Sequence, residues 1–162
     1  MAQICSTVYQ KLIGNRDEAV CKPSHPHHPS TLWSGLCQEN MEYTLLLGME
    51  LCKEYSVRYK KEHGSLQILN YIKRNSPELP SGGEALMDFG AYRITPPALA
   101  MPDKYKSKDP VKSYRDYYIN EKTHRKDGKT MMIYTRRDPP NWLSDKFVFE
   151  KIDEKSIMKE RK

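Results

Sequence analysis

The sequence has no long hydrophobic run, and this absence excludes several classes of protein. No apolar stretch approaches the ~20 residues that a helix needs to cross a bilayer. Residues 1–13 are not followed by a small-residue cleavage site of the kind that ends a secretory signal peptide. We therefore predict a cytoplasmic protein without membrane association. Its four cysteines are then expected to be reduced thiols.

The sequence also lacks the short motifs of the common catalytic and nucleotide-binding sites. It contains no GxxxxGK(S/T), GxGxxG, HExxH or GxSxG pattern. The familiar signatures of phosphate loops, dinucleotide sites, zinc proteases and serine hydrolases are therefore missing. We predict no cofactor.

Hydrophobic residues are also scarce, at 38% of the 162 residues, whereas charged residues make up 30%. A chain of this length predicts one domain, which can still bury about two thirds of its unfolded surface. The low apolar content indicates that part of the chain is a long loop or a tail. We predict a single helical domain over residues 1–152 and a charged tail over residues 153–162.

The longest regular pattern predicts a central helix over residues 39–62, ended by Gly64. Apolar residues recur there at spacings of three or four, the period of one helix face. This face consists of Met41, Leu45, Met49, Cys52, Tyr55 and Tyr59. Such a helix would be roughly 36 Å long at 1.5 Å per residue, so the rest of the chain must pack on it. We expect Trp33 and Leu45 to be buried in the same neighbourhood.

Shorter helices are predicted from their end signals. One covers Ala2–Ile13 and stops at Gly14, and a short helical turn begins at Ser30 as its N-cap. Another covers residues 66–73 and is capped by Ser65.

The C-terminal part of the chain opens with a further helix. Asp109 and Pro110 are a preferred start signal and predict a helix over residues 109–124, lying across the central one. Its inward residues are expected to be Val111, Tyr114 and Tyr118. Before it, residues 76–109 hold eight prolines and glycines and predict a long ordered loop. Short strands are predicted over residues 130–136 and 146–151. The expected fold is mainly α, a compact single domain around one long helix, with a small β hairpin near the C-terminus.

Positive charge is concentrated in one part of the chain. The net charge is +6, and residues 104–137 contain 11 basic and four acidic residues, a local excess of +7. A basic segment of this density suits a polyanion, and duplex DNA is the first candidate. A solvated surface without a partner is the alternative, because charge alone discriminates weakly.

Basic and aromatic residues alternate around this segment and form the candidate site. Lysine and arginine neutralise phosphates, and aromatic faces stack on exposed bases. The candidate DNA-binding residues are Arg58, Lys60, Lys61, Lys104, Lys112, Arg115, Lys122, Arg136 and Arg137. Tyrosines at helical spacing also fit a packed core, so the arginines are the preferred contacts.

A cluster of cysteines and histidines raises the question of a zinc site. Its members are Cys21, His25, His27, His28 and Cys37. Thiolate and imidazole are suitable zinc ligands, but this spacing matches no finger or knuckle pattern. We predict that no metal is bound.

Several short motifs occur in an order that resembles one known family. They are His28-Pro29-Ser30-Thr31-Leu32-Trp33, Glu54-Tyr55-Ser56-Val57-Arg58-Tyr59, Ala98-Leu99-Ala100-Met101-Pro102-Asp103-Lys104-Tyr105, Ser113-Tyr114-Arg115-Asp116-Tyr117-Tyr118 and Pro140-Asn141-Trp142. The chain resembles a family of small phage-encoded proteins described as pyrimidine-dimer DNA glycosylase-like, of the endonuclease V type. The motif residues that we single out are His28, Trp33, Tyr59, Tyr118 and Trp142.

The resemblance implies a compact helical protein that acts on duplex DNA in the infected host cell. Such enzymes use a free α-amine as nucleophile and a glutamate on a helix beside it, and they extrude a base. In the family, a helical stretch bearing His, Lys and Glu precedes the segment that matches residues 2–9. The first predicted helix here contains no Asp or Glu, so no residue takes the glutamate's role. We expect glycosylase activity to be absent or very weak. The chain is then either a phage DNA-transaction protein of the glycosylase/AP lyase type that is catalytically incomplete, or a non-catalytic phage protein that binds DNA or a host protein through the same basic surface.

Overall fold

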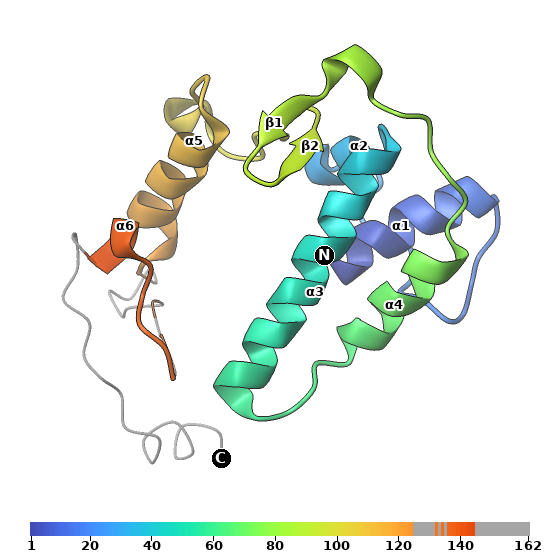
Figure 1. Ribbon diagram of the computed structural model, residues 1–162, viewed down its shortest axis with the longest axis horizontal. Helices are drawn as coiled ribbons and strands as arrows, with labels where there is room; N and C mark the ends of the chain where they lie inside the picture. The colour runs from blue at the N-terminus through green and yellow to red at the C-terminus, as the bar shows by residue number, and fades with distance from the viewer. Residues whose placement is uncertain (125–131, 133, 135, 145–162) are drawn as a thin grey trace.

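The computed structural model describes residues 1–124, 132, 134 and 136–144, and it has a mainly helical fold built around one long helix (Figure 1). In chain order the elements are α1 (Ala2–Ile13), α2 (Pro29–Ser34), α3 (Gln38–Tyr59), α4 (Ser65–Asn75), the 3₁₀ turn η1 (Gly83–Ala85), strands β1 (Met87–Phe89) and β2 (Tyr92–Ile94), the 3₁₀ turn η2 (Asp103–Tyr105), α5 (Pro110–Tyr117), the π-helical turn η3 (Tyr118–Lys122) and α6 (Asn141–Ser144). The predicted fold class, mainly α with a small hairpin, is confirmed.

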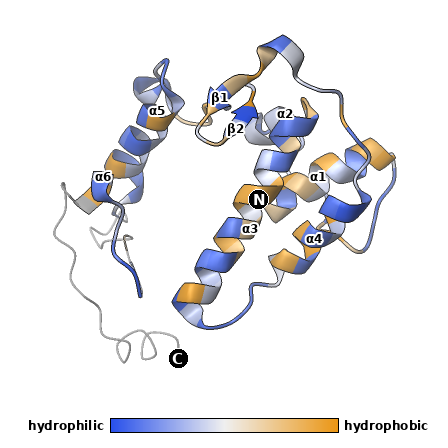
Figure 2. Ribbon diagram, in the orientation of Figure 1, coloured by the Kyte–Doolittle hydropathy of each residue, from blue (hydrophilic) through white to orange (hydrophobic). Residues whose placement is uncertain are grey.

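The main core lies where α1 and α4 pack against α3. Figure 1 shows α1 and α4 on one side of α3, and Figure 2 shows hydrophobic residues where these helices meet. The buried cluster consists of Ala2, Cys5, Val8, Tyr9, Val20, Met41, Leu45, Cys52, Leu69 and Ile72. Each helix thus contributes one apolar face to a shared core, as helix-on-helix layers require.

The apolar stripe predicted for the central helix is confirmed from Met41 to Cys52, but the helix ends earlier than predicted. Met41, Leu45 and Cys52 are buried. The helix stops at Tyr59 because Lys60 adopts a left-handed conformation, with φ of 54°, and its N–H donates to the Ser56 carbonyl at 2.9 Å. Gly64 therefore does not end this helix.

A glycine inside α3 allows the three core helices to approach closely. A Cβ atom at Gly48 would lie 2.9 Å from the Cδ1 atom of Leu69, closer than packed carbon atoms allow. Leu69 is fully buried and has little room to move aside. A residue with low helix propensity therefore stands here because α4 packs against it.

The N-cap of α2 differs from the prediction. His28, not Ser30, is the capping residue, and its Nδ1 atom accepts a hydrogen bond from the Ser30 N–H at 3.2 Å. Trp33 packs edge-on against Tyr43, with ring centroids 6.0 Å apart, on a different face of α3 from Leu45. The expectation that Trp33 and Leu45 share one buried neighbourhood was therefore wrong.

One buried amide joins α2, α3 and the hairpin. Asn40 of α3 donates from Nδ2 to the Trp33 carbonyl at 2.9 Å and to Thr95 Oγ1 at 2.7 Å. Its Oδ1 atom accepts from the Thr95 N–H at 3.0 Å. Asn40 has no exposed surface, so all of these partners are provided by the protein. The amide thereby sets where β2 lies on α3.

The small hairpin lies earlier in the chain than predicted. β1 and β2 pair antiparallel, with Met87 opposite Ile94 and Phe89 opposite Tyr92, inside the segment predicted as a loop. Gly90 is in the turn with φ of 62°, a conformation that glycine adopts without strain. Of the strands predicted over residues 130–136 and 146–151, most residues lie outside the described part of the chain.

The start of α5 is confirmed, but its inward face is not the predicted one. The Asp109 carboxylate accepts from the N–H groups of Val111 and Lys112, at 2.8 and 3.2 Å. Val111 and Tyr114 are exposed, whereas Ser113 is fully buried and hydrogen-bonds Ser107. In Figure 1, α5 lies on the side of α3 away from α1 and α4, rather than directly across α3.

Two further predictions concern membrane spans and the charged tail. No helix in the described ranges is long and apolar enough to span a membrane. The predicted charged tail over residues 153–162 lies outside the described residues.

We predict that Leu45→Ala lowers the free energy of unfolding by about 2–5 kcal/mol, the usual cost of truncating a buried leucine. Urea denaturation followed by circular dichroism measures the change. The matched control is Leu51→Ala in the same helix, because Leu51 is 52% exposed. The control should change stability by no more than about 0.5 kcal/mol. Equal costs for the two variants would contradict the placement of the core.

We also predict that Asn40→Ala destabilises the fold by about 3 kcal/mol, because each buried polar group left without a partner costs about 1–3 kcal/mol. The exposed Asn15, whose amide makes a single long contact to Ile13, provides the control variant Asn15→Ala. Thermal and urea unfolding of both proteins give the comparison. A loss of under 1 kcal/mol for Asn40→Ala would mean that water replaces the amide.

Candidate nucleic-acid interface and the adjoining pocket

Three of the predicted DNA-binding arginines meet at the C-terminal end of α3. Arg58 Nε donates to Glu54 Oε1 at 2.6 Å, and Arg137 donates to the other oxygen of the same carboxylate. Arg136 donates to the backbone carbonyl of Arg58 at 2.6 Å, which satisfies one of the unpaired groups at the helix end. A single carboxylate thus gathers cations that are about 80 residues apart in the chain.

The charge of these arginines changes the acidity of Glu54. Partial burial acts to raise the pKa of Glu54, but hydrogen bonds and charge from Arg58 and Arg137 outweigh it and hold this pKa below its ordinary value. Arg58 also lies over the Tyr134 ring, with its guanidinium carbon 5.2 Å from the ring centroid. Burial and a hydrogen bond with Tyr118 raise the pKa of Tyr134 to about 12. These groups therefore keep fixed charge states at neutral pH.

Most of the predicted lysines around α5 are paired with carboxylates. Lys112 Nζ lies 2.6 Å from Asp116, and Lys104 Nζ lies 2.8 Å from Glu121. The hydrogen bond to Glu121 is the main reason that the pKa of Lys104 rises to about 12. Exposed pairs of this kind are worth little to stability, and they leave less free positive charge than the sequence count suggests.

Arg115 and Lys122 differ from these lysines. Each is exposed and makes no ion pair with any residue in the described part of the chain. The guanidinium of Arg115 lies 5.2 Å from the centroid of the Trp142 ring, and Lys122 Nζ lies 5.2 Å from the centroid of the Tyr117 ring. Stacking on an aromatic face holds a cation in place without neutralising its charge.

Three aromatic rings connect Arg115 on α5 with Arg58 at the end of α3. Tyr118 packs edge-on against Trp142, with centroids 6.0 Å apart, and hydrogen-bonds Tyr134. A continuous series of contacts therefore runs from Arg115 through these three rings to Arg58. The aromatic residues contact one another and the arginines, so they form a support for the cations rather than open platforms for bases.

The other predicted residues lie at the turn after α3. Lys60 is the left-handed residue that ends the helix, and Lys61 Nζ lies 5.9 Å from the centroid of the Tyr55 ring. Tyr59 packs on Tyr55, with centroids 4.6 Å apart. Two motif residues thus have structural contacts: Tyr59 packs on Tyr55, and His28 caps α2.

The cysteines and histidines considered for zinc do not form a site in the described residues. No three side chains of His, Cys, Asp or Glu there are placed to hold one ion. Cys37 is buried at the start of α3, and burial raises its pKa, which disfavours the thiolate that zinc requires. His25 hydrogen-bonds its neighbour Ser24, and His28 caps α2.

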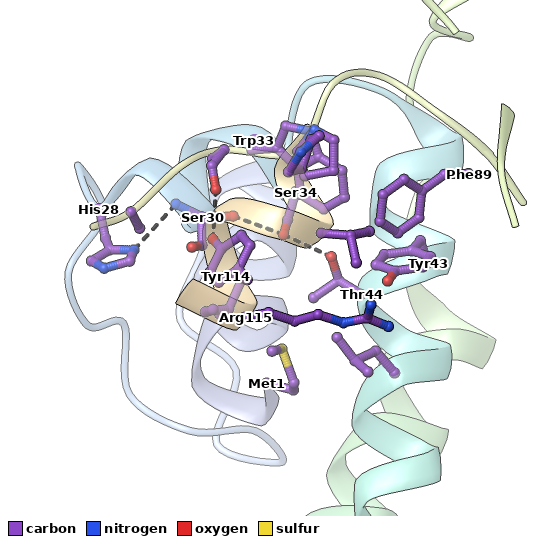
Figure 3. Close-up of a pocket in the computed structure, with 17 residues that line it drawn as sticks. Met1, His28, Ser30, Trp33, Ser34, Tyr43, Thr44, Phe89, Tyr114 and Arg115 are labelled. Atoms are coloured by element: carbon purple, nitrogen blue, oxygen red, sulfur yellow. Dashed lines mark hydrogen bonds between the residues drawn. The ribbon is translucent and has the colours of Figure 1, made fainter. Parts of the chain in front are cut away.

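A pocket of about 510 Å³ lies between α5 and the α2–α3 corner (Figure 3). Its walls are formed by Met1, Ile4, Trp33, Tyr43, Leu47, Phe89, Pro97, Ala98, Ala100, Pro110, Val111 and Tyr114, with His28, Ser30, Ser34, Thr44 and Arg115 adding polar atoms. Figure 3 shows the Arg115 side chain extending from α5 across the pocket toward Thr44 and Tyr43. None of the described lining residues is Asp or Glu.

Some of these contacts could be anticipated from spacing, and others could not. Glu54 with Arg58 and Lys112 with Asp116 stand four residues apart on helices, a spacing that predicts ion pairs. The ion pair between Glu54 and Arg137 depends on long-range packing, as does the pocket. Neither has a signal in the sequence.

Comparison of the chain with family models, curated proteins and solved structures finds no match. The resemblance to glycosylase-like phage proteins therefore stays a prediction.

The lowered pKa of Glu54 predicts a loss of stability in acid. A carboxyl with a depressed pKa stabilises the fold above its unfolded pKa, about 4.3, and this contribution is lost as the pH falls toward the folded pKa. Between about pH 5 and pH 3, a range that brackets the unfolded pKa, the free energy of unfolding should therefore fall less for Glu54→Gln than for the wild type. Urea midpoints at each pH measure the difference. Glu50→Gln, on the same helix with an exposed Lys53 partner, should behave as the wild type does.

Proposed function

We propose that this chain binds duplex DNA without cleaving a glycosidic bond, and that it does so through a basic face on η2, α5 and η3. The face consists of Lys104, Lys112, Arg115 and Lys122. The observation that supports the proposal most directly is the presence of Arg115 and Lys122, two exposed cations that lie on aromatic rings and have no ion pair in the described residues.

The chemistry of these two cations suits phosphate. Arginine and lysine release counterions when they contact the DNA backbone, and this term is independent of base sequence. Lys104 and Lys112 can add contacts when a phosphate competes with their exposed carboxylate partners, because such pairs are weak in water. We infer phosphate contacts that position the chain on the duplex, and no reading of base sequence.

The pocket beside this face supports a binding role rather than a catalytic one. Its described lining offers no carboxylate that could act as general acid, base or stabiliser of a developing positive charge. Incubation with irradiated duplex DNA followed by alkali should therefore produce no strand cleavage above background.

The DNA-binding proposal is tested with the double variant Arg115→Ala, Lys122→Ala. Fluorescence anisotropy of a labelled duplex across a salt series gives the slope of log affinity against log salt, which changes by about 0.9 for each phosphate contact. We expect the double variant to bind all sequences more weakly and to flatten the slope by about two, one for each cation removed.

The matched control is the double variant Lys11→Ala, Arg16→Ala. It removes the same charge from the exposed end of α1 and from the loop that follows it, on the other side of α3 from α5. Its slope should stay within experimental error of the wild type. An unchanged slope in the Arg115, Lys122 variant would remove this face from the proposal. Failure of the wild type to bind DNA at low salt would favour a protein partner instead.

A further inference from the structure

We propose that the pocket between α5 and the α2–α3 corner binds a small aromatic anion, with its rings in the apolar cavity and its anionic group on Arg115. The proposal concerns a small-molecule site and does not rest on DNA binding, although both proposals use Arg115. Three observations support it: the size of the cavity, the aromatic cluster in its wall, and the hydrogen bonding and charge of its polar groups.

The cavity has the size and lining of a ligand site. Its volume of about 510 Å³ falls within the ~300–1,000 Å³ of small-molecule pockets, which are lined mainly by apolar and aromatic side chains. Ile4 and Leu47 approach it from two different core helices, and Pro97 and Ala98 approach it from the long connection before α5. Residues from α1, α2, α3, β1, the connection before α5 and α5 itself thus line one space.

One wall of the pocket is a preassembled aromatic cluster. Tyr43 packs edge-on against both Trp33 and Phe89, with ring centroids 6.0 Å apart in each pair. The Trp33 indole N–H donates to the Thr95 carbonyl at 3.3 Å, which holds the ring in place. An aromatic ligand would add one more ring to a rigid edge-to-face arrangement, and little conformational entropy would be lost on binding.

Several polar groups of the pocket are hydrogen-bonded within the protein, whereas Arg115 meets no carboxylate among the described residues. Ser34 Oγ bonds to the Ser30 carbonyl and to Thr44 Oγ1, both at 2.8 Å. The Tyr114 hydroxyl donates to the Ala98 carbonyl at 2.6 Å. The guanidinium of Arg115, in contrast, crosses the cavity, and in the described residues its N–H donors meet no carboxylate (Figure 3).

The charge balance then defines the ligand. Arg115 brings a permanent positive charge, and none of the described lining residues brings a negative one. A guanidinium binds carboxylate, sulfonate or phosphate with two parallel hydrogen bonds. An apolar molecule without charge would leave these donors unused, whereas a cation would be repelled. The pocket therefore suits a molecule with aromatic rings and one anionic group.

The test uses two probes that differ only by one sulfonate group. The anilinonaphthalene sulfonate anion and the neutral phenylnaphthylamine share one ring system, and the fluorescence of both increases in apolar sites. With the wild-type chain we expect one site per molecule and an affinity at least tenfold higher for the sulfonate. Arg115→Met should remove that preference while leaving the affinity for the neutral probe within twofold. Arg115→Lys, which keeps the charge, should retain part of the preference.

Two further variants locate the site. Ala98→Leu, which narrows the cavity, should weaken both probes at least fivefold. Arg74→Met, which removes an exposed arginine at the end of α4, should leave the affinity for both probes unchanged. Circular dichroism melts confirm that each variant is folded, so that binding to a partly unfolded state is not measured. Equal affinity of the wild type for the two probes, several weak sites instead of one, or a preference for the anion that survives Arg115→Met would each overturn the proposal.

Discussion

One buried amide fixes how α2, α3 and the hairpin lie against one another. Asn40 lies on α3, has no exposed surface, and hydrogen-bonds the end of α2 and the residue that follows β2. Apolar packing of α1, α3 and α4 would form a core without it, because hydrophobic contacts are non-directional. The hydrogen bonds of the amide, in contrast, are directional. The amide sets where the hairpin lies, and the hairpin in turn brings Phe89 and the following connection to the wall of the pocket.

A second constraint is the distribution of charge. The segment over residues 104–137 contains a large excess of basic residues, yet the structure pairs Arg137, Lys112 and Lys104 with Glu54, Asp116 and Glu121, respectively. Such pairs change the surface from a uniform basic field to a few separate cations. Arg115 and Lys122 are supported by aromatic rings instead, which fix their position and leave their charge available. This difference in partner, rather than the number of charges, separates a candidate binding residue from an ordinary surface residue.

Arg115 belongs to both surfaces that we consider. Its backbone is on α5, its guanidinium lies near Trp142, and its side chain crosses the mouth of an apolar cavity. A phosphate on the outer face and an anionic group in the pocket would each use the same donors, so one anion on Arg115 would exclude the other. The geometry thus couples the two proposals in a simple competitive way, without any conformational change.

The sequence by itself determined where the longer helices lie and the class of the fold. The apolar stripe through Met41, Leu45 and Cys52, the Gly14 stop and the Asp109 cap are local signals, because helix periodicity and capping depend on residues only a few positions apart. Only the tertiary structure decided which cations keep a free charge, that Asn40 holds the hairpin, and that a pocket lies between α5 and the α2–α3 corner. These features join residues more than 40 positions apart, such as Glu54 with Arg137 and Asn40 with Thr95. No spacing along the chain encodes such a contact, since it forms only when the apolar faces of separate helices have been packed together.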